Sequence, residues 1–183
     1  MDETGDIIDM IEEQHMEIRE LLVAVTGAGP ADRDEPFAQL VRLLAVHETA
    51  EEEIVYPAVR AIDAAAEAIV SARLTEEDAA KKALAELERM DAASPEFAAA
   101  LARLHQDVDR HATSEEREVL PLLERLDAGQ RDRMAAAFAA AGAVAPTHGH
   151  RIAPESGLGN ALFSPFVAFV DRLRDAVRGP AKR

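Results

Sequence analysis

Two segments of the chain carry a histidine and a carboxylate at matching places. Residues 46–57 read VHETAEEEIVYP and residues 110–121 read RHATSEEREVLP, and their shared His, Glu-Glu, Val and Pro positions are each 64 residues apart. In both segments the histidine precedes a glutamate by four residues. On a helix the two side chains would differ in direction by only about 40°, so they could act together. Neutral imidazole nitrogen and carboxylate oxygen suit first-row metals such as iron, manganese or zinc.

These side chains interrupt helical stripes that are otherwise apolar. Apolar residues at three- and four-residue spacing predict helices over about residues 6–25, 36–65 and 94–126. The last of these begins at a Ser94-Pro95 capping signal, and Pro57 is expected to kink the second helix without ending it. Five ionisable residues stand where an apolar side chain is due: His15, His47, Glu51, His111 and Glu115.

Ionisable residues on a core stripe need partners, because an unpaired buried charge or imidazole is costly. A metal ion meets that need, and two carboxylates that face each other across a bundle can bridge two ions. A single buried histidine is more often a hydrogen-bonded core residue, and one His-x3-Glu pair is a weak signal. The same pair twice, with a further histidine on another helix, favours a metal site.

A fourth predicted helix, over about residues 67–90, contains no histidine. Its spacing puts Glu77 on the buried stripe at the position where a ligand is due. Glu77 could supply an oxygen donor there, or it could pair with Lys81 in the order that favours a helical salt bridge. Both readings stay open at this point.

The remaining candidates are weaker. Tyr56 lies about 180° from the ligand stripe in helical phase, so we expect it to pack in the helix and not to bind metal. His105 is about 120° away from the stripe, which favours a surface or interhelical position. His148 and His150 fall in an irregular segment, where an exposed loop position is the commoner outcome, although they could cover the end of the bundle or bind a second metal.

Composition excludes several other kinds of chemistry. The 183 residues include no cysteine, which excludes disulfides, thiolate metal sites and cysteine nucleophiles. A net charge of −15 argues against nucleic acid and anionic membranes as partners. Neither a secretory signal nor a membrane-spanning run is recognisable, so we expect a cytoplasmic protein, either a monomer or a homodimer.

The four long helices predict an all-α fold, an up-down four-helix bundle. The repeat then relates two helical hairpins by a pseudo-twofold axis. We expect the bundle to occupy residues 1–128 and a C-terminal extension to occupy residues 129–183. The extension would contain a short helix over 130–141, an irregular stretch over 142–160 and a Phe-rich helix over 161–177 that packs on the bundle, with a dimer contact as the alternative.

The motifs of residues 6–126 resemble those of the hemerythrin-like (HHE cation-binding) domains. The resemblance rests on His15, on HETAEEEIVYP and on HATSEEREVLP, and the tail APTHGHRIAPESGLGN is similar to a bacterial, actinobacterial-type branch. It implies two non-haem iron ions as cofactor. The ligands would be His15, His47, Glu51, His111 and Glu115, with the two glutamates bridging the ions. The helix that carries Glu77 departs from the family pattern, because that helix usually supplies one or two histidines.

The resemblance also implies a function. A di-iron centre inside a bundle would act on small diatomic or peroxide ligands, such as hydrogen peroxide, nitric oxide or O2. We expect peroxidase- or catalase-like detoxification, with an O2, NO or redox carrier or sensor, or iron handling without turnover, as alternatives. Three His with two or three Glu make an oxygen-rich site compared with the five-His sites of oxygen carriers. Such a site favours the ferric state and weakens the case for reversible O2 carriage.

Overall fold

A computed structural model describes residues 5–63 and 65–144, which form helices and no strand. The elements follow the chain as α1 (Ile7–Gly27), α2 (Asp34–Ala50), the π-helical turn η1 (Glu51–Val55), α3 (Tyr56–Ile62), α4 (Ala66–Leu87), α5 (Pro95–Glu118), α6 (Leu120–Leu123) and α7 (Ala128–Val144). Within the described ranges, no helix combines the length and the apolar character that a membrane span requires.

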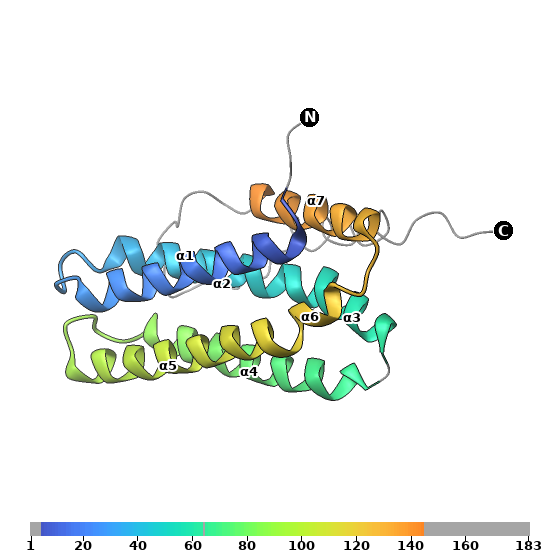
Figure 1. The fold of residues 1–183 in the computed structure, drawn as a ribbon. Helices are drawn as coiled ribbons and strands as arrows, with labels where there is room; N and C mark the ends of the chain where they lie inside the picture. Colours follow the sequence, from blue (N-terminus) through green and yellow to red (C-terminus); the bar gives the residue numbers. More distant parts are fainter. Residues whose placement is uncertain (1–4, 64, 145–183) are drawn as a thin grey trace.

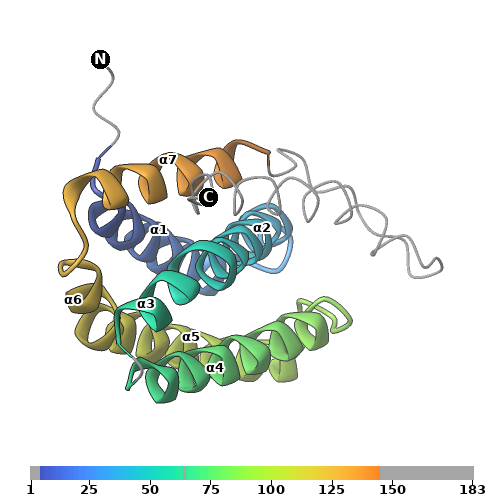
Figure 2. The same cartoon turned by 90° about the vertical axis from the view of Figure 1, so that its right-hand side faces the viewer.

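The predicted up-down four-helix bundle is confirmed. The hairpin of α1 and α2 packs on the hairpin of α4 and α5, and α7 lies across the outer side of the first hairpin (Figures 1 and 2). Short loops join the long helices, as the two-hairpin interpretation of the repeat requires.

Local sequence signals fix where two of the helices begin. Asp6 caps α1, with its side chain accepting a hydrogen bond from the Ile8 N–H at 3.1 Å. At the predicted start of α5, Ser94 accepts from the Phe97 N–H at 3.1 Å and Pro95 is the first helical residue. Each cap satisfies an N–H that has no partner within the helix.

The two repeated prolines interrupt their helices in different ways. Pro57 has no N–H to donate, and its ring would collide with the Glu53 carbonyl in a regular α-helix. The chain adapts through η1, in which the Tyr56 N–H donates to the Glu51 carbonyl five residues back. The other predicted helix, over 94–126, is not continuous: it breaks at Val119, two residues before Pro121.

The apolar core consists of two clusters that a polar layer separates. On each of the four bundle helices, a buried histidine or glutamate lies between residues of one cluster and residues of the other. On α1, for example, Ile11 belongs to the first cluster and Ile18 to the second, with His15 between them. The ionisable residues therefore form one layer at mid-height in the bundle.

The first part of the C-terminal extension packs on the bundle. Helix α7 is longer than the predicted 130–141 and contacts α1, α2 and η1, with Met134 and Phe138 buried in the first cluster. The rest of the predicted irregular stretch and the predicted helix over 161–177 lie outside the described residues, as do His148 and His150.

Candidate metal centre

The fold brings the six predicted ligands together in the polar layer, and each is at most 9% exposed. They come from every long helix of the bundle: His15 from α1, His47 from α2, Glu51 from η1, Glu77 from α4, and His111 and Glu115 from α5. Their donor atoms form two groups, and within each group the atoms lie within 4.8 Å of one another. The first group is His15, His47, Glu51 and Glu115; the second is Glu51, Glu77 and His111. Glu51 belongs to both, which is the arrangement that a bridging carboxylate needs.

The histidines direct their Nε2 atoms toward the carboxylates. The distance from His47 Nε2 to Glu51 Oε1 is 3.1 Å, and that from His15 Nε2 to Glu115 Oε2 is 3.3 Å. His111 Nε2 lies 3.6 Å from the same Glu115 oxygen. Glu115 therefore faces two histidines, although it belongs to only one of the two groups of donor atoms.

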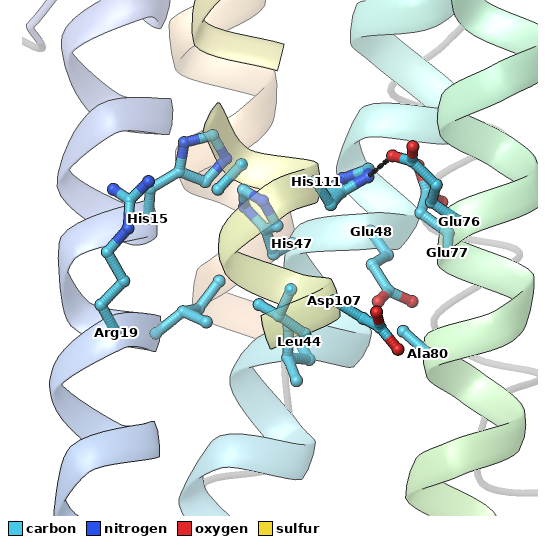
Figure 3. Close-up of a pocket in the computed structure, with 13 residues that line it drawn as sticks. His15, Arg19, Leu44, His47, Glu48, Glu76, Glu77, Ala80, Asp107 and His111 are labelled. Atoms are coloured by element: carbon cyan, nitrogen blue, oxygen red, sulfur yellow. Dashed lines mark hydrogen bonds and ion pairs between the residues drawn. The ribbon is translucent and has the colours of Figure 1, made fainter. Parts of the chain in front are cut away.

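Each Nδ1 atom is held by a side-chain oxygen from another helix. His15 Nδ1 lies 3.0 Å from Glu116 Oε1, and His111 Nδ1 lies 3.0 Å from Glu76 Oε2. Figure 3 shows the second of these bonds as a dashed line between α5 and α4. His47 Nδ1 lies 2.9 Å from Gln14 Oε1. An acceptor at Nδ1 places the proton there and leaves the Nε2 lone pair facing the centre, as in histidines that bind metals.

The inner donor atoms have no hydrogen-bond partner among the described residues. They are the Nε2 atoms of the three histidines, both oxygens of Glu51, and one oxygen each of Glu77 and Glu115. Buried polar atoms without partners are costly, and here they converge from four helices. Mixed imidazole and carboxylate donors are the set that a first-row transition metal prefers, so these residues fit a metal ion.

Tyr56 contradicts the expectation that it faces away from the ligands. It is fully buried, and its hydroxyl lies 2.5 Å from Glu77 Oε1 and 2.9 Å from Glu115 Oε1. The extra residue of η1 is the cause, because it turns the following helix back by about 100°, which leaves Tyr56 about 80° from His47 instead of about 180°. Tyr56 thus links two of the candidate ligands, Glu77 on α4 and Glu115 on α5.

Burial and the neighbouring ionisable groups shift the pKa values of Glu51 and Glu115 in opposite directions. Burial and the charge of Glu115 raise the pKa of Glu51 well above its ordinary value. The pKa of Glu115 is lowered to about 2, because its interactions with the nearby His15 and His111 imidazoles outweigh its burial. Two close carboxylates cannot both ionise freely, so Glu115 carries the charge and Glu51 keeps the proton.

Burial also keeps other groups of the centre neutral. It lowers the pKa of His47 to about 3, with the nearby His15 adding to the effect. It raises the pKa of Glu77 to about 9, against the opposing hydrogen bond from Tyr56. A neutral imidazole is the form that binds a metal, whereas Glu77 would release its proton on binding one.

The predicted Glu77–Lys81 pair is present, but it is not the nearest contact of either residue. Lys81 Nζ lies 3.7 Å from Glu77 Oε2 and forms a much shorter bond with Glu52. Glu77 is 1% exposed, and its other oxygen is bound to Tyr56. The salt bridge and the ligand geometry therefore occur together.

A cavity of about 20 Å³ adjoins the three histidines and Glu77. Glu48, which is 3% exposed, also lines it, and burial raises the pKa of Glu48 to about 8. The side chains of α1, α2, α4 and α5 converge on this space in Figure 3. The volume suffices for about one water molecule.

Sequence reasoning missed the residues that hold the histidines. Gln14 and Glu76 are half-buried and lie beside the ligand stripe in phase, so periodicity alone gave no reason to choose them. Glu116 had a signal, because the second glutamate of the Glu-Glu pair is repeated together with the first. His105 is half-buried on α5 and belongs to neither donor group, as expected.

Comparison with known proteins agrees with the geometry. Residues 6–123 match the family model described as the hemerythrin HHE cation binding domain. A hemerythrin-like protein of Schizosaccharomyces pombe is 30% identical over 139 residues, which are 75% of this chain and 68% of that protein. The crystal structure of a hemerythrin HHE cation binding domain-containing protein from Mycobacterium kansasii has a similar fold, with a TM-score of 0.66 at 20% identity. That likeness covers 92% of this chain and 99% of the other.

Proposed function

The chain belongs to the hemerythrin HHE cation-binding domain family, and on this premise we propose that it is a non-haem di-iron protein that turns over small oxidants. Hydrogen peroxide is the substrate we favour, with nitric oxide and O2 as related ligands. The six residues of the two donor groups would hold the two ions. Bound iron would supply Lewis acidity and a one-electron redox couple at these donors.

The observation that carries the proposal is the small cavity beside the donor atoms. At about 20 Å³ it is the size of one water molecule, so it suits a diatomic molecule or peroxide better than an organic substrate. Ile18, Leu44, Val108 and two alanines supply its apolar walls, and Arg19, Glu76 and Asp107 line it together with Glu48 and Glu77. These apolar walls limit water, while Glu48, which belongs to neither donor group, can hold or release a proton beside a bound oxidant.

The donor set supports turnover over reversible carriage of O2. Three carboxylates bring anionic oxygen to the centre, and anionic ligands stabilise the more highly charged ferric ion. Tyr56 adds a hydroxyl that holds two of these carboxylates in place.

The test is to load purified protein with iron, measure the iron per chain, and follow the visible spectrum during additions of peroxide, NO or O2. Two irons per chain with sustained peroxide consumption would support the proposal. A reversible band with O2 and no consumption would identify a carrier, and iron that is only taken up and released would indicate iron handling.

The chain offers a matched pair of variants for this test. His111 and His105 lie on the same helix, but only His111 belongs to a donor group. We expect His111→Ala to lower the iron per chain and peroxide consumption, and His105→Ala to change neither. Equal iron content and turnover in both variants would refute the metal site.

A further inference from the structure

The buried positions of α1 recur on α4 with the same spacing. The first set is Ile11, His15, Ile18, Leu22 and Val25, and the second is Arg73, Glu77, Ala80, Leu84 and Leu87. Glu77 thus occupies in one hairpin the position that His15 occupies in the other. The residue four places further along is basic in both helices, Arg19 on α1 and Lys81 on α4.

On the α1 side, the Glu116 carboxylate contacts both His15 and Arg19. Glu116 Oε1 lies 3.0 Å from His15 Nδ1 and accepts a hydrogen bond from Arg19 Nη1 at 3.1 Å. Glu116 is the second glutamate of the second repeated segment. The arginine fixes the carboxylate, and the carboxylate in turn fixes the imidazole.

In the other half, the matching glutamate is Glu52, which forms a short ion pair with Lys81 and also interacts with the Glu77 carboxyl. Lys81 Nζ also lies 3.7 Å from Glu77 Oε2 and 3.7 Å from Glu48 Oε2. A carboxylate can accept a hydrogen bond from an imidazole, but it repels a second carboxylate. Lys81 places a cation beside both acidic groups, which offsets the repulsion between Glu52 and an ionised Glu77.

We propose that Lys81, anchored by Glu52, is a positioning residue that orients the Glu77 carboxylate toward the metal centre, as Glu116 orients His15. The inference rests on the metal-binding function proposed above. Lys81 is suited to this task because it faces three carboxylates from η1, α2 and α4. Its side chain is 43% exposed, so replacing it leaves the apolar core intact.

The experiment titrates metal-free protein with Co²⁺ under anaerobic conditions and follows the visible spectrum. We expect Lys81→Met to weaken binding at one metal position by about tenfold to a hundredfold, the usual cost of losing a residue that supports a ligand. Lys81→Arg should restore most of the affinity, because it keeps the cation. Lys82→Met removes the same charge from the adjacent exposed position and should bind Co²⁺ as the wild type does.

A double variant separates positioning from a general charge effect. Because Lys81 acts through Glu77, adding Lys81→Met to Glu77→Gln should weaken binding no further than Glu77→Gln alone. Wild-type affinity in Lys81→Met or in Glu77→Gln would overturn the proposal. Additive losses in the double variant would overturn it as well. In each case the other ligands would still bind metal, so the metal-binding function would stand. If the wild type itself binds no Co²⁺, the metal-binding function fails, and this inference fails with it.

Discussion

The three histidines of the candidate centre differ in the groups that bind their Nδ1 atoms. His15 and His111 are each bonded to a carboxylate, and each of those carboxylates is bound by an arginine, Arg19 or Arg73. A carboxylate at Nδ1 makes an imidazole a stronger electron donor and fixes the orientation of its ring. The residues that hold these histidines are therefore as much a part of the candidate centre as the histidines themselves.

Glu116→Gln tests this arrangement at the level of one residue. The change removes the charge that both His15 and Arg19 contact while keeping the size of the side chain. We expect metal affinity to fall by about tenfold to a hundredfold with the fold retained. Glu12→Gln, at an exposed position on α1, is the control. Equal Co²⁺ titration curves for the two variants would contradict the prediction.

At the scale of the helices, the sequence predicted the elements and the buried layer of His and Glu side chains better than the interruptions of the helices. The apolar stripes were long and regular, so periodicity placed the four bundle helices and showed that His47 and His111 point inward. The π-turn η1 follows from Pro57, yet a proline permits several distortions, and tertiary packing selects among them. Tyr56 was misplaced for this reason alone, since one additional residue in a turn changes the phase of everything after it.

Contacts across helices were also beyond the reach of periodicity. Lys81 was considered as a partner of Glu77 because the two are four residues apart on one helix. Its bond to Glu52 spans two elements and depends on how they pack. Such pairs become visible only when the register of one helix against another is known.

Helix α7 covers the centre on the side of α2. The Phe138 ring lies against the His47 ring, with 6.3 Å between their centroids, and Phe138 is 1% exposed. We expect Phe138→Ala to lower the free energy of unfolding by about 3–5 kcal/mol, measured by urea denaturation. It should also speed the loss of metal to a chelator, because water would reach His47.

Phe37 provides the comparison for this prediction. It is half-buried and packed on Phe97 in the second apolar cluster, which contains no residue of α7. Phe37→Ala should cost less stability and leave the rate of metal loss unchanged. Similar rates of metal loss in the two alanine variants would show that α7 does not protect the centre.

At the scale of the whole molecule, the buried acids make metal-free stability depend on pH. The pKa values of Glu48 and Glu77, about 8 and 9, lie above the ordinary value of 4.5, so the folded state binds protons that the unfolded state has released. Stability therefore falls as pH rises, and between about pH 7 and pH 9 the free energy of unfolding should decrease. His47 does not add to this window, because its pKa lies lower.

Urea denaturation of the metal-free protein at pH 7 and pH 9 checks this prediction. Glu48→Gln should reduce the difference between the two values, because the amide cannot ionise. Metal should reduce it as well, by taking the place of the protons on Glu51 and Glu77. Constant or rising stability over this range would contradict the assignment of these acids as protonated.

The polar layer has a further consequence for how the molecule holds together. Among the described residues, the buried apolar side chains form two separate clusters, and the polar layer lies between them. Without an ion, we expect each end of the bundle to unfold as a separate cooperative unit. Hydrogen exchange should then give two distinct opening energies, one for each end, that merge into one when metal is bound. An ion at mid-height would therefore couple the two ends of the bundle, in addition to its role in the proposed reaction.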